Sequence, residues 1–83
     1  MRGYVIKITH TATEYNKFFQ TGEKKEYFIV KGGYVKPTNY GFILQEDLYK
    51  SKSATKRVIT RYKSYKTPED PSFTTSYDVV EID

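Results

Sequence analysis

Three stretches of the chain predict β-strands, and in the first of them, 3–9, the residues alternate with the two-residue period of a strand. In the stretch 3–9, Tyr4 and Ile6 fall on one side of the extended chain. The stretches 25–31 and 76–82 are rich in Tyr, Phe, Val and Ile, the residue types that fit a half-buried pleated surface. We expect 76–82 to pair with 3–9 in the centre of a sheet, because both carry apolar residues on two faces.

The second strand is followed by a hairpin signal. Gly32 and Gly33 tolerate the positive φ that a tight turn requires, and 34–36 can return as a short third strand. Pro37 ends that strand because it has no N–H to donate to the ladder. The apolar run 42–44 fits either a short buried strand or a plug in the core.

The hydrophobic period changes to that of a helix in residues 51–65. Ser51 is suited to cap the first turn, and apolar side chains recur at i, i+4, i+8 and i+11. These apolar residues are Ala54, Val58, Tyr62 and Tyr65. At about 100° per residue, the lysines lie opposite this stripe and the arginines flank it. The helix is therefore expected to pack on a sheet and to face water with a basic ridge.

Residues 10–25 fit two different structures. Thr11 and Glu14 have the spacing of a capping box, which predicts a short second helix at 12–20. Three aromatic residues at i, i+3 and i+4 would then share one face that packs in the core: Tyr15, Phe18 and Phe19. The alternative is an aromatic-rich loop, in which the same rings form an exposed apolar patch that marks an interaction surface. Gly22 ends either structure.

Together these segments predict one α+β domain over residues 1–83, with a small, mostly antiparallel sheet of three to five strands and one basic amphipathic helix on one face. Residues 66–72 hold two prolines and are expected to form a turn-rich connector. The chain has no cysteine, which fits a reducing compartment. Its apolar runs are too short to cross a bilayer, and its N-terminus lacks the features of a secretory signal. We therefore expect a soluble cytoplasmic protein.

Charge is distributed unevenly around the net value of +4. Residues 50–67 carry seven basic side chains and no acidic one, whereas 68–83 carry five acidic side chains and no basic one. The basic residues are Lys50, Lys52, Lys56, Arg57, Arg61, Lys63 and Lys66. They can neutralise phosphates, and Tyr49, Tyr62 and Tyr65 between them can stack on unpaired bases. They also fit an acidic protein partner, or a solvated helix face that the acidic last strand compensates.

Residues with catalytic or metal-binding chemistry are few and scattered. His10 is the single histidine, and we interpret it as a partly exposed residue at the end of the first strand. No nucleophile accompanies it in a hydrolytic triad, and Gly32-Gly33 lacks the spacing of a phosphate-binding loop. We therefore predict no catalytic residues, no cofactor and no metal site.

Three motifs resemble parts of small uncharacterised accessory proteins from phages and prophages of low-GC Gram-positive bacteria. They are Tyr4-Val-Ile-Lys-Ile8, Leu48-Tyr-Lys-Ser-Lys-Ser-Ala54 and Tyr77-Asp-Val-Val-Glu-Ile82. The chain departs from that pattern in the aromatic insert at 10–25 and in the connector. The resemblance implies a phage or mobile-element protein in the cytoplasm of a bacterial host. Such proteins often inhibit a host enzyme or defence system by stoichiometric binding, anti-CRISPR activity being one instance.

These features support three hypotheses for function. The first is a non-enzymatic accessory protein that binds and inhibits a host protein. The second is a small nucleic-acid-binding module that uses the basic helix 51–65. The third is self-association through an uncovered edge strand such as 34–36 or the terminal strand. The candidate binding residues are the seven basic residues named above together with Tyr15, Phe18 and Phe19, and no membrane contact is expected.

Overall fold

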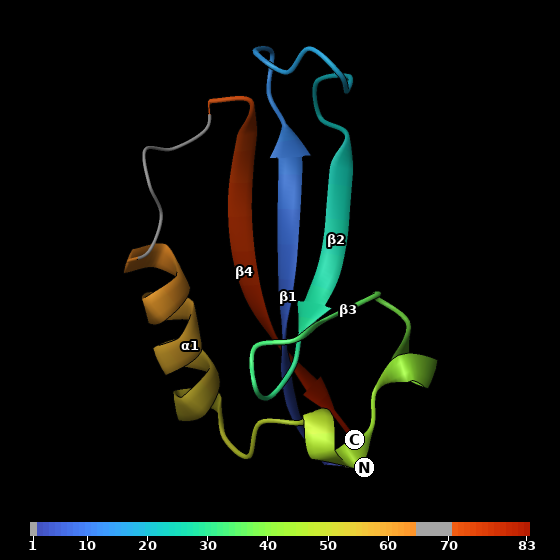
Figure 1. The fold of residues 1–83 in the computed structure, drawn as a ribbon, viewed down its shortest axis with the longest axis vertical. Coiled ribbons are helices and arrows are strands. Elements are labelled where there is room, and N and C mark those ends of the chain that lie inside the picture. The colour runs from blue at the N-terminus through green and yellow to red at the C-terminus, as the bar shows by residue number, and fades with distance from the viewer. Residues whose placement is uncertain (1, 65–70) are drawn as a thin grey trace.

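The computed structural model describes residues 2–64 and 71–83, and Figure 1 shows the arrangement of the elements. The strands are β1 (Gly3–Ala12), β2 (Lys24–Ile29), β3 (Val35–Lys36) and β4 (Phe73–Ile82). The helix α1 spans Lys52–Ser64, and two short 3-10 turns span Tyr40–Phe42 and Gln45–Asp47. Two residues of the predicted binding surface, Tyr65 and Lys66, lie outside the described residues, as does most of the predicted connector.

The four strands form one antiparallel sheet in the order β3-β2-β1-β4, which confirms the α+β fold. The predicted pairing of the first and last strands is also confirmed, because β1 and β4 pair along the whole of both strands. Of these two strands, however, only β1 lies inside the sheet. β2 occupies its other side, with Ile6 opposite Ile29, and β4 is left at the edge of the sheet.

Two small hydrophobic clusters lie on the two faces of the sheet, since neighbouring residues of a strand point to opposite faces. On the face that α1 covers, the buried residues are Ile6, Ile8, Ile29 and Tyr49. The other cluster is formed by Val5, Phe28, Val30, Ile43, Leu48 and Ile82. Each face thus receives its own cover: the helix on one side and the segment 40–48 on the other.

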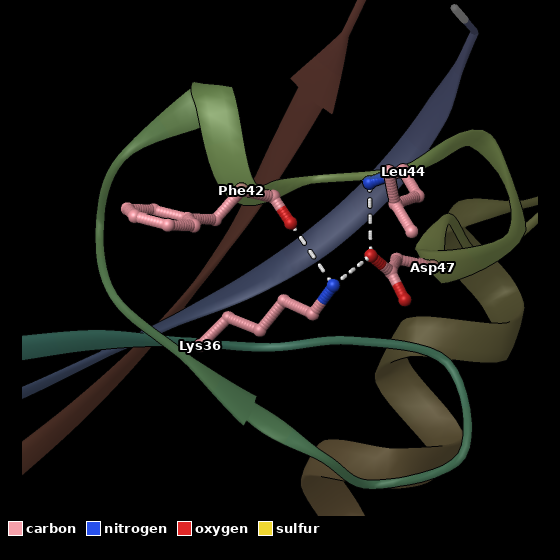
Figure 2. A network of polar contacts seen from close by, with 4 residues as sticks. All are labelled: Lys36, Phe42, Leu44 and Asp47. Carbon is pink, nitrogen blue, oxygen red and sulfur yellow. Dashed lines mark hydrogen bonds and ion pairs between the residues drawn. The ribbon is translucent and has the colours of Figure 1, made fainter.

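The run 42–44 is a core plug rather than a strand. Ile43 is buried between the two 3-10 turns, whereas Phe42 and Leu44 on either side of it are exposed. Figure 2 shows the polar contacts that hold this segment. The ammonium of Lys36 donates to the Phe42 carbonyl over 2.9 Å and to the Asp47 carboxylate, which also accepts from the Leu44 N–H over 2.8 Å. One ion pair therefore ties β3 to the covering segment.

The chain after this plug comes unusually close to β1. Tyr4 and Tyr49 exchange two backbone hydrogen bonds of 2.9 and 2.8 Å, which extend the sheet locally. A Cβ at Gly3 would lie 2.5 Å from the Cβ of Leu48 and 2.9 Å from the Tyr49 carbonyl oxygen. Glycine at position 3 therefore allows the segment before α1 to pack directly on β1.

The helix forms where the sequence predicts it. It begins after Ser51, whose hydroxyl accepts a hydrogen bond of 3.2 Å from the Ala54 N–H. Ala54, Val58 and Tyr62 pack on the sheet as expected, and Ile59 joins them. Thr55 is also fully buried, and its hydroxyl is satisfied because it donates to the Lys52 carbonyl over 2.6 Å.

The helix proposed at 12–20 is wrong, because residues 13–23 form a loop between β1 and β2. Thr11, the proposed cap, is a strand residue that pairs with Lys24 on one side and Thr74 on the other. Its backbone is committed to the sheet, so a helix cannot start there. Backbone hydrogen bonds of 2.8 Å between Ala12 and residues 22 and 23 close the loop.

Candidate partner-binding site

The loop 13–23 is held in shape by polar side chains. The Asn16 carboxamide oxygen accepts hydrogen bonds of 2.9 Å from the backbone N–H groups of both Phe18 and Phe19. Its Nδ2 donates to the Ser72 carbonyl over 3.2 Å, and the Thr13 hydroxyl donates to the Pro71 carbonyl. The loop is therefore anchored to the start of β4 as well as to itself.

This framework presents two aromatic rings to solvent. Phe18 is 90% exposed and Tyr15 is 66% exposed. Phe19 is half-buried, with its ring centroid 6.0 Å from that of Phe73 and the Lys25 ammonium 4.1 Å from the Phe19 centroid. A shallow hollow of about 310 Å³ lies among these residues. We call Tyr15, Phe18 and Phe19 the aromatic tip.

The structure thus decides between the two interpretations of these residues. The expectation that they lie in the core is wrong for Tyr15 and Phe18, since helical spacing brings rings together only where a helix exists. The loop alternative is confirmed, and the loop lies at one end of the sheet (Figure 1). The loop does bring all three residues together, around one hollow.

The basic residues of α1 do not form one ridge. Because Thr55 and Ile59 also face the sheet, the buried side of the helix is broader than the predicted stripe. At about 100° per residue, Lys52 and Lys63 therefore border it on one edge and Arg61 on the other, whereas Lys56 and Arg57 stay on the outer side. Arg61 lies on the side of the Gly32-Gly33 turn, whereas the Lys63 ammonium lies 5.6 Å from the Tyr77 ring of β4.

All of the described basic candidates are exposed: Lys50, Lys52, Lys56, Arg57, Arg61 and Lys63. β4 contacts α1, as it must if its acidic residues compensate the charge of the helix. Within residues 2–64 and 71–83, however, no ion pair joins the two elements. The ion pairs found there are Lys7–Glu26 and Lys36–Asp47. The cations of the helix are therefore not neutralised by direct pairing within the described chain.

His10 is not a strand-end residue, because β1 continues for two residues beyond it. It is half-buried, with Nδ1 at 2.8 Å from the Thr75 hydroxyl and Nε2 at 2.7 Å from the Tyr27 hydroxyl. Burial raises the pKa of Tyr27, and the neighbouring Tyr77 and Tyr62 raise it further. The network joins three strands and is fully accounted for by its structural role.

A second set of exposed apolar side chains lies around β3 and the plug: Tyr34, Val35, Tyr40, Phe42 and Leu44. The sequence pattern indicated no binding role for these residues, because a run such as 42–44 has the composition of a buried segment. Pro37 and Gly41 could have indicated that these side chains are exposed, because both residues favour turns. A chain that turns twice within a few residues cannot bury every side chain between the turns.

Neither a protein-family model, nor a curated protein, nor a solved structure matches this chain. The class of protein is therefore set by the fold alone, which is a small α+β domain with a four-stranded antiparallel sheet. The resemblance to phage accessory proteins stays a prediction.

The helices among the described residues are too short and too polar to reach across a bilayer.

Proposed function

We propose that this chain is a non-enzymatic binding protein that docks on a protein partner through the aromatic tip. The resemblance to phage accessory proteins adds that the partner is a host protein in the bacterial cytoplasm, which the bound chain inhibits. The observation that supports the docking most strongly is the exposure of Phe18 on an ordered loop. Phe18 is 90% exposed, and transfer of its large apolar side chain from water into an interface lowers the free energy of the complex.

The order of the loop matters as much as its exposure. Binding costs free energy for every side chain and loop that must be immobilised, and a loop already fixed avoids much of that cost. Aromatic residues in turn contribute most of the affinity at many interfaces, since a ring buries a large area with few rotatable bonds. The hydrogen bonds that the Asn16 carboxamide oxygen accepts and the contact of Phe19 with Phe73 supply this order.

Replacing Phe18 by serine should abolish partner capture without affecting the fold. A ring with little contact to its own chain contributes little stability, so the free energy of unfolding should change by less than about 0.5 kcal/mol. The measurement is quantitative mass spectrometry of proteins retained from host lysate by the wild type, by Phe18→Ser and by a matched control, Phe42→Ser, whose ring is 57% exposed at the other end of the sheet.

The proposal requires one protein retained in stoichiometric amount by the wild type and by Phe42→Ser but not by Phe18→Ser. Addition of the wild type, and not of Phe18→Ser, should then inhibit the activity of that protein. Equal retention by all three forms, or loss only with Phe42→Ser, would show that the aromatic tip is not the docking site.

A nucleic-acid-binding module is the second candidate, and the cations of α1 favour it, since they are exposed and make no ion pair with the residues that the structure describes. Phosphates that neutralise these side chains would release counterions, so the affinity should fall with salt. A fluorescence-anisotropy titration of single-stranded and duplex DNA over a salt series measures this effect. Lys52→Gln with Lys56→Gln should reduce the slope, by about 0.7–0.9 for each phosphate that is no longer neutralised.

The matched control for this second candidate is Lys24→Gln with Lys25→Gln, which removes the same charge from β2. If both double variants weaken binding equally, the net charge of the chain and not the helix is responsible. Absence of binding at low salt would reject the candidate altogether.

A further inference from the structure

A cleft of about 480 Å³ lies between α1 and the turn that joins β2 to β3. It is lined by Gly32, Gly33, Tyr49, Val58, Arg61 and Tyr62. In Figure 1 this turn passes beside α1, whereas the aromatic tip lies at the far end of the strands. The cleft is therefore separate from the proposed docking site.

Two tyrosine rings in the cleft are fixed in position. The Tyr49 hydroxyl donates a hydrogen bond of 3.0 Å to the Val30 carbonyl, and the Tyr62 hydroxyl approaches the Gly33 carbonyl at 3.4 Å. Because these carbonyls lie at the two ends of the turn, the hydroxyls tie both rings to it. Tyr49 is itself buried, so the half-buried Tyr62 and Val58 supply the apolar surface of the cleft, which exists before any ligand arrives.

The glycines give the cleft its other wall. Gly32 and Gly33 adopt φ values of +93° and +83°, which side chains rarely tolerate. A Cβ at Gly33 would lie 3.5 Å from the Tyr62 hydroxyl, in ordinary contact with it, so the turn passes directly beside this side chain. Because glycine has no side chain, the peptide backbone itself is accessible to a flat ligand that lies against the Tyr62 ring.

The charge of the cleft comes from one residue. Arg61 is the single ionisable lining residue apart from the tyrosines, and it is exposed with no ion-pair partner within residues 2–64 and 71–83. A guanidinium binds phosphate through two parallel N–H donors, which a lysine cannot do. The cleft therefore combines a flat apolar surface with one phosphate-binding group at its rim.

We propose that this cleft binds a nucleotide, with the base against Tyr62 and Val58 and the phosphate on Arg61. Base stacking on aromatic rings contributes binding energy with any base, because every base has a π face. The same chemistry is presented by a free nucleotide and by one residue of a single strand. The inference goes beyond the docking of a protein partner, and only its single-strand form extends the nucleic-acid candidate.

The test is a titration of the ¹⁵N-labelled protein with uridine monophosphate, with uridine and with inorganic phosphate, followed by NMR. The monophosphate should shift the amide signals of Gly32, Gly33 and Tyr62, and should bind more tightly than either of its two parts alone. Arg61→Gln should weaken its binding at least about ten-fold, because even one hydrogen bond to a charged group contributes that much and the guanidinium can supply two. The matched control Arg57→Gln, one helical turn earlier and outside the lining, should change it less than two-fold.

Two results would overturn the inference. One is general attraction of anions. It would appear as signal shifts spread over the basic residues of α1, or as binding of the monophosphate that Arg61→Gln and Arg57→Gln weaken equally. The other is uridine binding as tightly as its monophosphate. An oligouridylate that binds through the cleft more tightly than the monophosphate identifies a single strand as the source, and an equal affinity identifies the free nucleotide. Oligonucleotide binding that bypasses the cleft leaves the helix candidate standing and excludes a single strand as the source.

Discussion

Replacing Ile6 by alanine is expected to lower the free energy of unfolding by about 2–5 kcal/mol, because it leaves a cavity in the most enclosed part of the fold. Ile6 is fully buried in the central strand, with Ile29 opposite it on one side and Val79 on the other. A domain of this size has about 5–15 kcal/mol of stability in total, so this single change removes a large part of it. Urea unfolding followed by circular dichroism measures the loss.

The matched control is Val35→Ala, which also shortens a β-branched residue in a strand but at a site that is 62% exposed. Its expected cost is below about 0.5 kcal/mol. If the two variants are equally stable, then β1 is not the centre of the packed sheet. The division of the core into two clusters around that strand would then be wrong.

Replacing Asp47 by alanine should cost about 1.5–3 kcal/mol, since hydrogen bonds to charged groups contribute that much. The change removes the partner of the Lys36 ammonium and the acceptor of the Leu44 N–H together. Both side chains are partly shielded from water, with exposed fractions of 26% for Lys36 and 13% for Asp47. The neighbouring Glu46→Ala, at an exposed position, is the control, with an expected change within about 0.5 kcal/mol.

The same ion pair makes stability depend on pH in one direction. The hydrogen bond from Lys36, with a second from the Leu44 N–H, holds the pKa of the Asp47 carboxyl below its ordinary value. The folded chain therefore binds this proton less tightly than the unfolded chain. The contribution is present above the unfolded value of about 4 and is lost as the pH falls through the lower folded pKa.

Urea unfolding of the wild type and Asp47→Ala between neutral pH and pH 3 tests this direction. The difference in stability between the two should be constant near neutrality and should shrink below about pH 4. A difference that grows on acidification would mean that the carboxylate is not stabilised by Lys36. Because the pair also positions the segment with Phe42 and Leu44, its removal should broaden their NMR signals.

Local patterns were reliable where one interaction decides the structure. The spacing of Ala54, Val58 and Tyr62 predicts the helix, since in a strand the polar Lys56 and Thr60 between them would lie on the same face. The Gly32-Gly33 pair predicts the turn, since few other residues adopt its positive φ. These elements follow from neighbouring residues and need no knowledge of the rest of the chain.

Patterns failed where two structures compete for the same residues. The capping-box spacing of Thr11 and Glu14 is real, but pairing of Thr11 with two strands uses the backbone that a helix would need. Helical spacing in α1 likewise could not place the lysines, because the buried Thr55 widens the side of the helix that faces the sheet. In both cases a contact distant in sequence outweighs a local preference.

The sequence by itself determined the elements: the strands, the turn, the helix with its cap, and a class of small α+β domain without cysteine. Only the tertiary structure decided that β4 is an edge strand, that the Phe18 side chain is exposed to solvent and that Arg61 borders a cleft beside Tyr62. The physical reason is the separation in sequence between the residues that interact. Strand and helix periods are set by residues a few positions apart, whereas exposure and clefts depend on which distant segment covers each side chain.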